Sequence, residues 1–235
     1  MINMKMKFFI VFFLILNFTN YLLAGAPPLN KVPIPPAPHS LVKTNHLIIG
    51  VEWDKNTLKD LLPKKLLNKS TITGGINIFN SKKKQAFSPL SGSYAWIDFS
   101  EKRKKEKLII FSIYGPNKTI NNVMKSVYNL NSYIGSNKVT LINDKAIATA
   151  SINKKNVLNL LSSGIEKCSK STGNDFLVTK FSTSEKIFKK VIWYSDEECI
   201  IKPEKVEFQG DFEKFKIKKM LWAKIQKNSE VIFDK

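Results

Sequence analysis

Few side chains in this sequence could act as nucleophiles, general bases or metal ligands. The two histidines, His39 and His46, lie near the start of the chain, and the two cysteines, Cys168 and Cys199, lie far downstream. This spacing matches no common zinc-binding pattern, and the histidines are remote in sequence from either thiol. We therefore expect no metal ion and no cofactor.

The first 26 residues have the composition of a secretory signal peptide. Lys5 and Lys7 precede an apolar run from Phe8 to Leu16, and small residues end the segment at Ala24-Gly25-Ala26. The run is shorter than the roughly 20 apolar residues of a membrane-spanning helix. We predict a signal peptide over residues 1–26 and a secreted or periplasmic protein, with an uncleaved N-terminal anchor as the alternative.

Export would place the cysteines in an oxidising compartment. Cys168 and Cys199 both belong to the mature chain and both have polar neighbours in sequence. A pair of cysteines in an exported protein favours a disulfide over free thiols. We predict a Cys168–Cys199 disulfide, with a reactive thiol as the alternative.

Lysine dominates the charged residues. Lysine and arginine total 38 against 19 acidic residues, a formal net charge of +19, and Arg103 is the only arginine. Nucleic-acid readout usually depends on the guanidinium fork, and no nucleic-acid-binding motif is present in the sequence. We expect no sequence-specific nucleic-acid binding but a weak attraction to anionic surfaces. A cationic adhesion module for acidic surfaces is one alternative function.

Apolar periodicity predicts one domain after a proline-rich segment. Residues 27–38 contain six of the ten prolines, so we expect a tether over 27–45 and a single domain over 46–235. Asp54 should cap a short helix that ends at Pro63 with Leu58, Leu61 and Leu62 inward, and further helices are expected at 119–130 and 157–161. Strands are expected at 46–53, 71–79 with a bulge at Gly74-Gly75, 94–99, 107–114, 139–142, 146–152, 176–181, 186–194, 200–208, 220–225 and 230–233. This is an α+β chain dominated by antiparallel sheet.

The domain resembles the acetoacetate decarboxylase family in three stretches of matching order and spacing. They are Val51-Glu52-Trp53-Asp54 with Leu58 and Leu61-Leu62-Pro63; Phe87-Ser88-Pro89-Leu90 with Tyr94; and Leu221-Trp222-Ala223 followed by 229–234. The resemblance spans residues 46–235. It implies a cone-shaped β-barrel with a few flanking short helices around an apolar pocket.

The resemblance also implies a reaction, decarboxylation of a β-keto acid through a Schiff base on a lysine of lowered pKa. In this sequence the family's lysine pair falls on Asn131-Ser132 or Ser132-Tyr133, and neither offers an amine. The family's glutamate after the Pro/Tyr element is also missing, because Ala95, Trp96 and Ile97 follow Tyr94.

We therefore predict an exported acetoacetate decarboxylase-like protein that lacks the Schiff-base lysine and binds a small carbonyl or carboxylate ligand, a role we favour over catalysis. The alternative is an active lyase that uses a displaced lysine, Lys125 or Lys138, with Asp98 as the nearest acid. A homo-oligomer is compatible with either hypothesis. The side chains expected to line the pocket are Tyr94, Trp96, Tyr128, Asn131, Ser132 and Tyr133.

Overall fold

The computed structural model describes residues 39–62, 64–81, 90–99, 106–115, 118–128, 130, 132–181 and 186–233. The expected signal peptide, the proline-rich residues 27–38, Arg103 and Asn131 lie outside these ranges. Within them, no helix is long and apolar enough to cross a membrane.

Strands make up most of the described chain. They are β1 (His39–Trp53), β2 (Ile72–Ser81), β3 (Ser91–Asp98), β4 (Glu106–Gly115), β5 (Ser132–Ile134), β6 (Ser136–Ile142), β7 (Lys145–Ile152), β8 (Lys155–Ser163), β9 (Cys168–Phe181), β10 (Lys186–Phe208) and β11 (Ile217–Phe233). The helical elements are short: α2 (Lys55–Leu58), α3 (Lys64–Leu67), α4 (Lys118–Ser126) and the 3-10 turn η1 (Gly210–Phe212).

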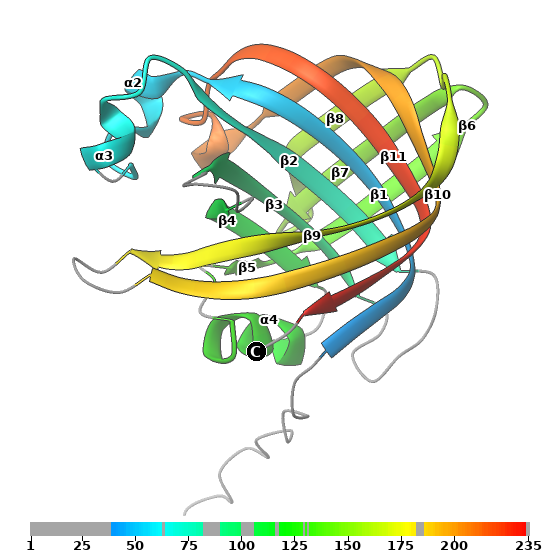
Figure 1. Ribbon diagram of the computed structural model, residues 1–235, viewed down its shortest axis with the longest axis horizontal. Coiled ribbons are helices and arrows are strands. Elements are labelled where there is room, and N and C mark those ends of the chain that lie inside the picture. Colours follow the sequence, from blue (N-terminus) through cyan, green and yellow to red (C-terminus); the bar gives the residue numbers. More distant parts are fainter. Residues whose placement is uncertain are drawn as a thin grey trace, which may run out of the picture. The chain divides into compact units, whose positions relative to one another are not determined.

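Seven of the strands form a closed ring. Its order is β11-β1-β2-β3-β4-β9-β10, and β10 pairs back onto β11 (Figure 1). Neighbours in the ring are antiparallel except β4 and β9, which run parallel. The second half of β10 continues out of the ring and pairs with β8, followed by β7 and β6. The predicted class, largely antiparallel sheet with few short helices, is confirmed.

Side-chain alternation gives the ring two apolar surfaces. One face of β1–β4 and β11 packs against β6, β7 and β8, which lie behind these strands in Figure 1. Leu47 and Ile49 of β1, Ile76 of β2 and Ile225 of β11 are fully buried in this core. Because successive side chains of a strand point to opposite faces, the residues between them face the inside of the ring.

A second apolar cluster lies on the inner face. The amphipathic helix α4 contributes Ile120, Val123 and Met124, which pack with Tyr114 of β4 and Phe233 of β11. The helix ends at Ser126, although the apolar spacing predicted a helix as far as Leu130. This cluster covers one end of the space that the ring encloses.

Further sequence predictions about the bounds and types of elements need correction. Strand β1 begins at His39 because its start pairs with the end of β11, so residues 39–45 belong to the sheet and not to a tether. Residues 157–161 lie in β8, since pairing with both β7 and β10 overrides the helical reading of a short apolar run. Strands β10 and β11 are each continuous where two strands were expected. Leu61 is 46% exposed, because α2 ends at Leu58 after one turn.

The predicted cap of α2 is present. The Asp54 side chain accepts a hydrogen bond from the backbone N–H of Asn56 at 3.0 Å. The expected bulge at Gly74-Gly75 is absent, because the pairing of β2 with β1 and with β3 runs through both glycines without a shift in register.

Two glycines allow β4 to cross close to the junction of β5 and β6. A Cβ atom on Gly115 would lie 1.6 Å from the carbonyl oxygen of Gly135. The backbone N–H of Gly135 donates to the carbonyl of Tyr114 at 3.0 Å. The two chain segments therefore meet backbone to backbone, with no room for a side chain at residue 115.

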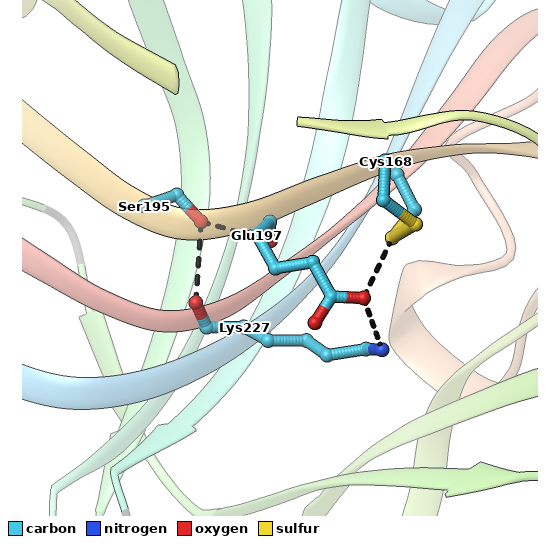
Figure 2. The surroundings of a disulfide bond; sticks show 5 residues. Cys168, Ser195, Glu197 and Lys227 are labelled. Carbon is cyan, nitrogen blue, oxygen red and sulfur yellow. Dashed lines mark hydrogen bonds and ion pairs between the residues drawn. A yellow bond between two sulfur atoms is a disulfide. The ribbon is translucent and has the colours of Figure 1, made fainter. Parts of the chain in front are cut away.

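The predicted disulfide is confirmed. Cys168 of β9 and Cys199 of β10 are directly opposed in the antiparallel ladder and are bonded to each other (Figure 2). Oε1 of Glu197 lies 3.2 Å from Sγ of Cys199 and 2.7 Å from Nζ of Lys227. A disulfide is compatible with an extracellular or periplasmic protein.

Candidate functional site

The inside of the ring contains a cavity of about 450 Å³. Every ring strand contributes to its wall. Aromatic side chains are prominent, and the polar groups are few and in contact with one another. The aromatic lining residues are Phe79, Tyr94, Trp96, Tyr114, Trp193, Trp222 and Phe233, and the ionisable ones are His46, Asp98, Lys107, Asp175 and Lys224 besides the tyrosines.

Cross-strand register arranges one side of the cavity in rows. One row runs across four neighbouring strands, from Lys224 of β11 through Ile48 of β1 and Asn77 of β2 to Tyr94 of β3. Directly opposed residues on one face of a sheet are in contact distance of each other. The sheet register therefore places a cationic, an apolar and two hydrogen-bonding side chains side by side along one wall.

The adjacent row explains the glycines Gly75 of β2 and Gly50 of β1. It runs from Trp222 through Gly50 and Gly75 to Trp96. A Cβ on Gly50 would lie 2.2 Å from the Trp222 ring, and one on Gly75 would lie 2.5 Å from the Trp96 ring. Each indole thus occupies the space that a side chain on the neighbouring strand would take, and only glycine leaves room for it.

Lys107 is the first of two cavity lysines. Its Nζ lies 2.8 Å from Oδ2 of Asp175 on β9 and 4.4 Å from the centroid of the Trp96 ring. The opposed residue on β3, Asp98, accepts hydrogen bonds from Nε1 of Trp96 and from the hydroxyl of Thr73, each at 3.0 Å. This end of the cavity therefore holds one ammonium group, ion-paired with Asp175, and a second carboxylate on the opposed residue Asp98.

Lys224 is the second. Its Nζ lies 2.8 Å from Oε2 of Glu198 and 4.8 Å from the centroid of the Trp193 ring. Gln226 donates to the same carboxylate oxygen at 2.6 Å. Burial raises the pKa of Glu198, but the hydrogen bonds from Lys224 and Gln226 outweigh it, and the net shift of this pKa is downward.

A register shift in β10 brings Glu198 to this position. Val191 and Trp193 line the cavity from the first part of the strand. The ladder with β9 shifts between Ser195 and Glu198, after which Glu198 opposes Gln226 of β11. The irregularity therefore changes which residues of β10 share a face with the cavity lysine.

A chain of buried polar groups runs behind Tyr94. Nδ2 of Asn77 lies 3.1 Å from the Tyr94 hydroxyl and 3.1 Å from Nδ1 of His46, and Nε2 of His46 lies 2.8 Å from the hydroxyl of Thr44. Burial lowers the pKa of His46 to about 4, and the nearby charge of Lys224 acts in the same direction. Burial also raises the pKa of Tyr94 to about 12, so this phenol stays protonated at neutral pH.

The buried histidine predicts acid sensitivity. Because the pKa of His46 is lower in the folded protein than its ordinary value of 6.5, the unfolded chain binds more protons between pH 6.5 and pH 4. Stability should therefore fall as the pH falls through this window, by about 2 kcal/mol from this residue between pH 7 and pH 5. Urea unfolding of the wild type and His46→Asn at both pH values measures the difference. An equal pH dependence in the two proteins would contradict the assignment.

Three of the sequence-predicted site residues meet in the cavity. Tyr94, Trp96 and Asp98 alternate along β3 and all face inward. Two predicted lysines do not reach it: Lys125 on α4 and Lys138 on β6 are both exposed.

The other predicted pocket residues lie elsewhere or outside the described ranges. Tyr128 is buried and its hydroxyl contacts His39 and the backbone of Phe233. Ser132 is buried and donates to Asn121, and Tyr133 is 42% exposed with its ring against Phe212. None of these three lines the cavity. Asn131 lies outside the described residues.

Sequence reasoning identified Asp98 but missed three other charged residues that line the cavity. Lys107, Asp175 and Lys224 come from three strands that only the closed ring brings together. A signal was present for Lys224, since Trp222, Lys224 and Gln226 alternate on one strand and share its inner face. Among 37 lysines this alternation does not stand out.

One group of side chains among the described residues has the spacing of a metal site. It consists of Cys168, Glu197 and Cys199. Because the two sulfur atoms are bonded to each other, neither is available as a thiolate ligand (Figure 2).

Comparison with solved structures identifies the fold. Acetoacetate decarboxylase from Legionella pneumophila has a TM-score of 0.66 at 13% identity, over 92% of this chain and 92% of that one. A second acetoacetate decarboxylase structure gives 0.61 at 11% identity, over 91% and 93%. The enduracididine biosynthesis enzyme MppR, complexed with the condensation product of pyruvate and imidazole 4-carboxaldehyde, gives 0.59 at 7% identity, over 90% and 92%.

In sequence, no family model and no curated protein matches this chain. The structural similarity at such low identity establishes the fold alone. The chain has an acetoacetate decarboxylase-like fold.

Proposed function

We propose that this protein binds a small organic acid with a carbonyl group and an apolar body inside the ring cavity. The observation that carries the proposal is the presence of two ammonium groups, on Lys107 and Lys224, in a cavity whose wall is otherwise largely aromatic and apolar. Binding sites of this kind combine apolar walls with a few fixed polar groups. One fold neighbour, MppR, was solved with pyruvate bound.

The wall chemistry orients such a ligand. Asp175 is ion-paired with Lys107 and Asp98 is the opposed residue, so a ligand carboxylate at that end would be repelled by two like charges. Lys224 faces a single carboxylate, Glu198, and shares its row with Tyr94 and Asn77. An ammonium has three donors, and the one ion pair leaves others for a ligand. We therefore place the ligand carboxylate at Lys224.

Removal of the Lys224 ammonium should weaken binding. In Lys224→Met we expect the affinity for hydrocinnamate, a carboxylate with a phenyl group, to fall about 30-fold, because a charged hydrogen bond is lost and Glu198 stays unpaired close to the ligand. Calorimetric titration measures the dissociation constant.

Lys138→Met is the matched control, since it removes one exposed lysine outside the cavity. Its affinity for hydrocinnamate should equal that of the wild type. Equal losses in the two variants would show that the binding reflects the overall positive charge of the protein, as an adhesion module for acidic surfaces requires.

The competing function is a carboxy-lyase that uses a displaced lysine. Lys125 and Lys138 are exposed, whereas Lys107 and Lys224 face the cavity. For this hypothesis, Lys107 and Lys224 are therefore the better candidates for the reactive amine. Schiff-base formation needs a free amine, whereas each cavity lysine is ion-paired at 2.8 Å. Incubation with benzoylacetate and borohydride followed by intact mass analysis should give no adduct. A single adduct on either lysine would replace the binding function with the lyase.

We further propose that the protein is exported by the signal peptide at residues 1–26. The Cys168–Cys199 disulfide supports an oxidising destination. The lysine-rich surface supports weak attraction to anionic surfaces over sequence-specific binding of nucleic acid. N-terminal sequencing of the exported protein tests the cleavage.

A further inference from the structure

The buried polar chain behind the cavity has a fixed direction. It starts at the backbone carbonyl of Ser229, which lies 2.9 Å from the hydroxyl of Thr44. A carbonyl oxygen only accepts hydrogen bonds, so the Thr44 hydroxyl must donate its single hydrogen to the Ser229 carbonyl. The Thr44 oxygen can then serve His46 only as an acceptor.

This assigns the tautomer of His46. Nε2 lies 2.8 Å from the Thr44 oxygen and must therefore carry a hydrogen. In the neutral imidazole the other nitrogen, Nδ1, then has a lone pair and needs a donor. Oδ1 and Nδ2 of Asn77 lie 3.3 Å and 3.1 Å from Nδ1, and because only Nδ2 carries hydrogens, it supplies that donor.

The same amide nitrogen completes the chain at Tyr94. Asn77 Nδ2 has two hydrogens, and the second points to the Tyr94 oxygen at 3.1 Å. Tyr94 is therefore the acceptor in this bond, and its own hydroxyl hydrogen has no acceptor among the described residues. Tyr94, Asn77 and His46 all line the cavity, so the unused hydrogen is available to a molecule inside it.

We propose that Tyr94 is the specificity-determining donor that recognises the ketone oxygen of the bound acid. The inference rests on the proposed function and adds the recognition of the ketone oxygen, which Lys224 does not contact when it binds the carboxylate. Lys224 and Tyr94 belong to one cross-strand row, with Ile48 and Asn77 between them. Both side chains line the same cavity, and we place the carboxylate of a keto acid at Lys224 and its ketone oxygen at Tyr94.

The buried polar chain leaves the Tyr94 hydroxyl hydrogen free for a ligand, because it excludes Asn77 as the acceptor of that hydrogen. If the amide of Asn77 were reversed, its oxygen would accept the Tyr94 hydrogen and the phenol would offer nothing to a ligand. The orientation of the amide follows from the His46 tautomer, which follows from the Ser229 carbonyl. The backbone carbonyl of Ser229 in β11 thus determines, through this chain of hydrogen bonds, that the Tyr94 hydroxyl of β3 can donate its hydrogen into the cavity.

The first test needs no ligand. Long-range proton–nitrogen NMR correlations of the full chain at pH 7 report which imidazole nitrogen carries the hydrogen. We expect the Nε2-protonated tautomer for His46. The Nδ1-protonated tautomer would overturn the assignment of Tyr94 whatever the protein binds.

The second test uses two acids that differ only in the ketone oxygen, freshly prepared benzoylacetate and hydrocinnamate. Tyr94→Phe should lose roughly 5- to 10-fold in affinity for benzoylacetate, the worth of one neutral hydrogen bond, and should keep its affinity for hydrocinnamate. Tyr133→Phe, which alters an exposed phenol outside the cavity, should bind both acids as the wild type does.

The outcomes separate the two proposals. Equal affinity of Tyr94→Phe and wild type for benzoylacetate, with both acids bound, would overturn the role of Tyr94 and leave the binding function in place. Binding of neither acid by the wild type would overturn both the binding function and the ketone recognition. Near-ultraviolet circular dichroism of Tyr94→Phe shows whether the variant keeps the native packing of its tryptophans.

Discussion

Replacement of Gly115 by alanine should destabilise the protein by about 3 kcal/mol. The new Cβ would lie 1.6 Å from the carbonyl oxygen of Gly135 and 2.8 Å from its carbonyl carbon. These are backbone atoms, so no side chain can rotate away. Separation of β4 from the β5–β6 junction would also break the hydrogen bond from the Gly135 N–H to the Tyr114 carbonyl. Urea unfolding of the purified variant measures the loss.

Gly210→Ala is the control for this experiment. Gly210 has a φ of +59°, and a Cβ there would meet no atom within 4 Å. The substitution should therefore cost only the backbone strain of the left-handed conformation, about 1 kcal/mol. A loss of similar size at both positions would show that the crossing of β4 over Gly135 is loose enough to accept a methyl group.

Removal of the disulfide has the second large expected effect. Cys168 and Cys199 are 31 residues apart in sequence, and release of a loop of this length in the unfolded chain costs about 3–4 kcal/mol of stability on the chain-entropy model. The double variant Cys168→Ala/Cys199→Ala should unfold at a correspondingly lower urea concentration. Ring closure should survive, because β9 and β10 remain paired over most of their length.

Wild-type protein unfolded in the presence of a reductant provides the matching measurement. Its free energy of unfolding should equal that of the double variant, since both lack the same cross-link. Unchanged stability in the double variant would mean that contacts remaining in the unfolded state already bring β9 and β10 together.

Strand positions were the most predictable part of this fold. Alternating apolar residues identify β3 and β4, and they identify β2 despite its two glycines. The same alternation divided β10 in two, because the acidic residues Glu197 and Glu198 occupy a register shift where the pattern breaks. Local periodicity also could not decide between helix and strand for β8, which β7 and β10 hold by pairing on both sides.

The candidate site was only half predictable. Tyr94, Trp96 and Asp98 follow from the alternation of one strand. Lys107 and Lys224 are distinguished from the other lysines by their ion pairs with Asp175 and Glu198 on other strands, and no local sequence pattern indicates those pairings. The resemblance pointed to Ser132 and Tyr133, but β5 pairs with β4 alone and does not reach the cavity wall.

The pairing of β1 with β11 also determines the order in which the cavity can form. The first strand of the described chain, β1, can complete its pairing only when the last strand, β11, is present, and contacts between such distant segments are slow to form. Until β11 arrives, the edges of β1 and β10 that it covers are open to pairing with other chains. The cavity is therefore assembled late in folding, and a chain interrupted before β11 would be prone to aggregation.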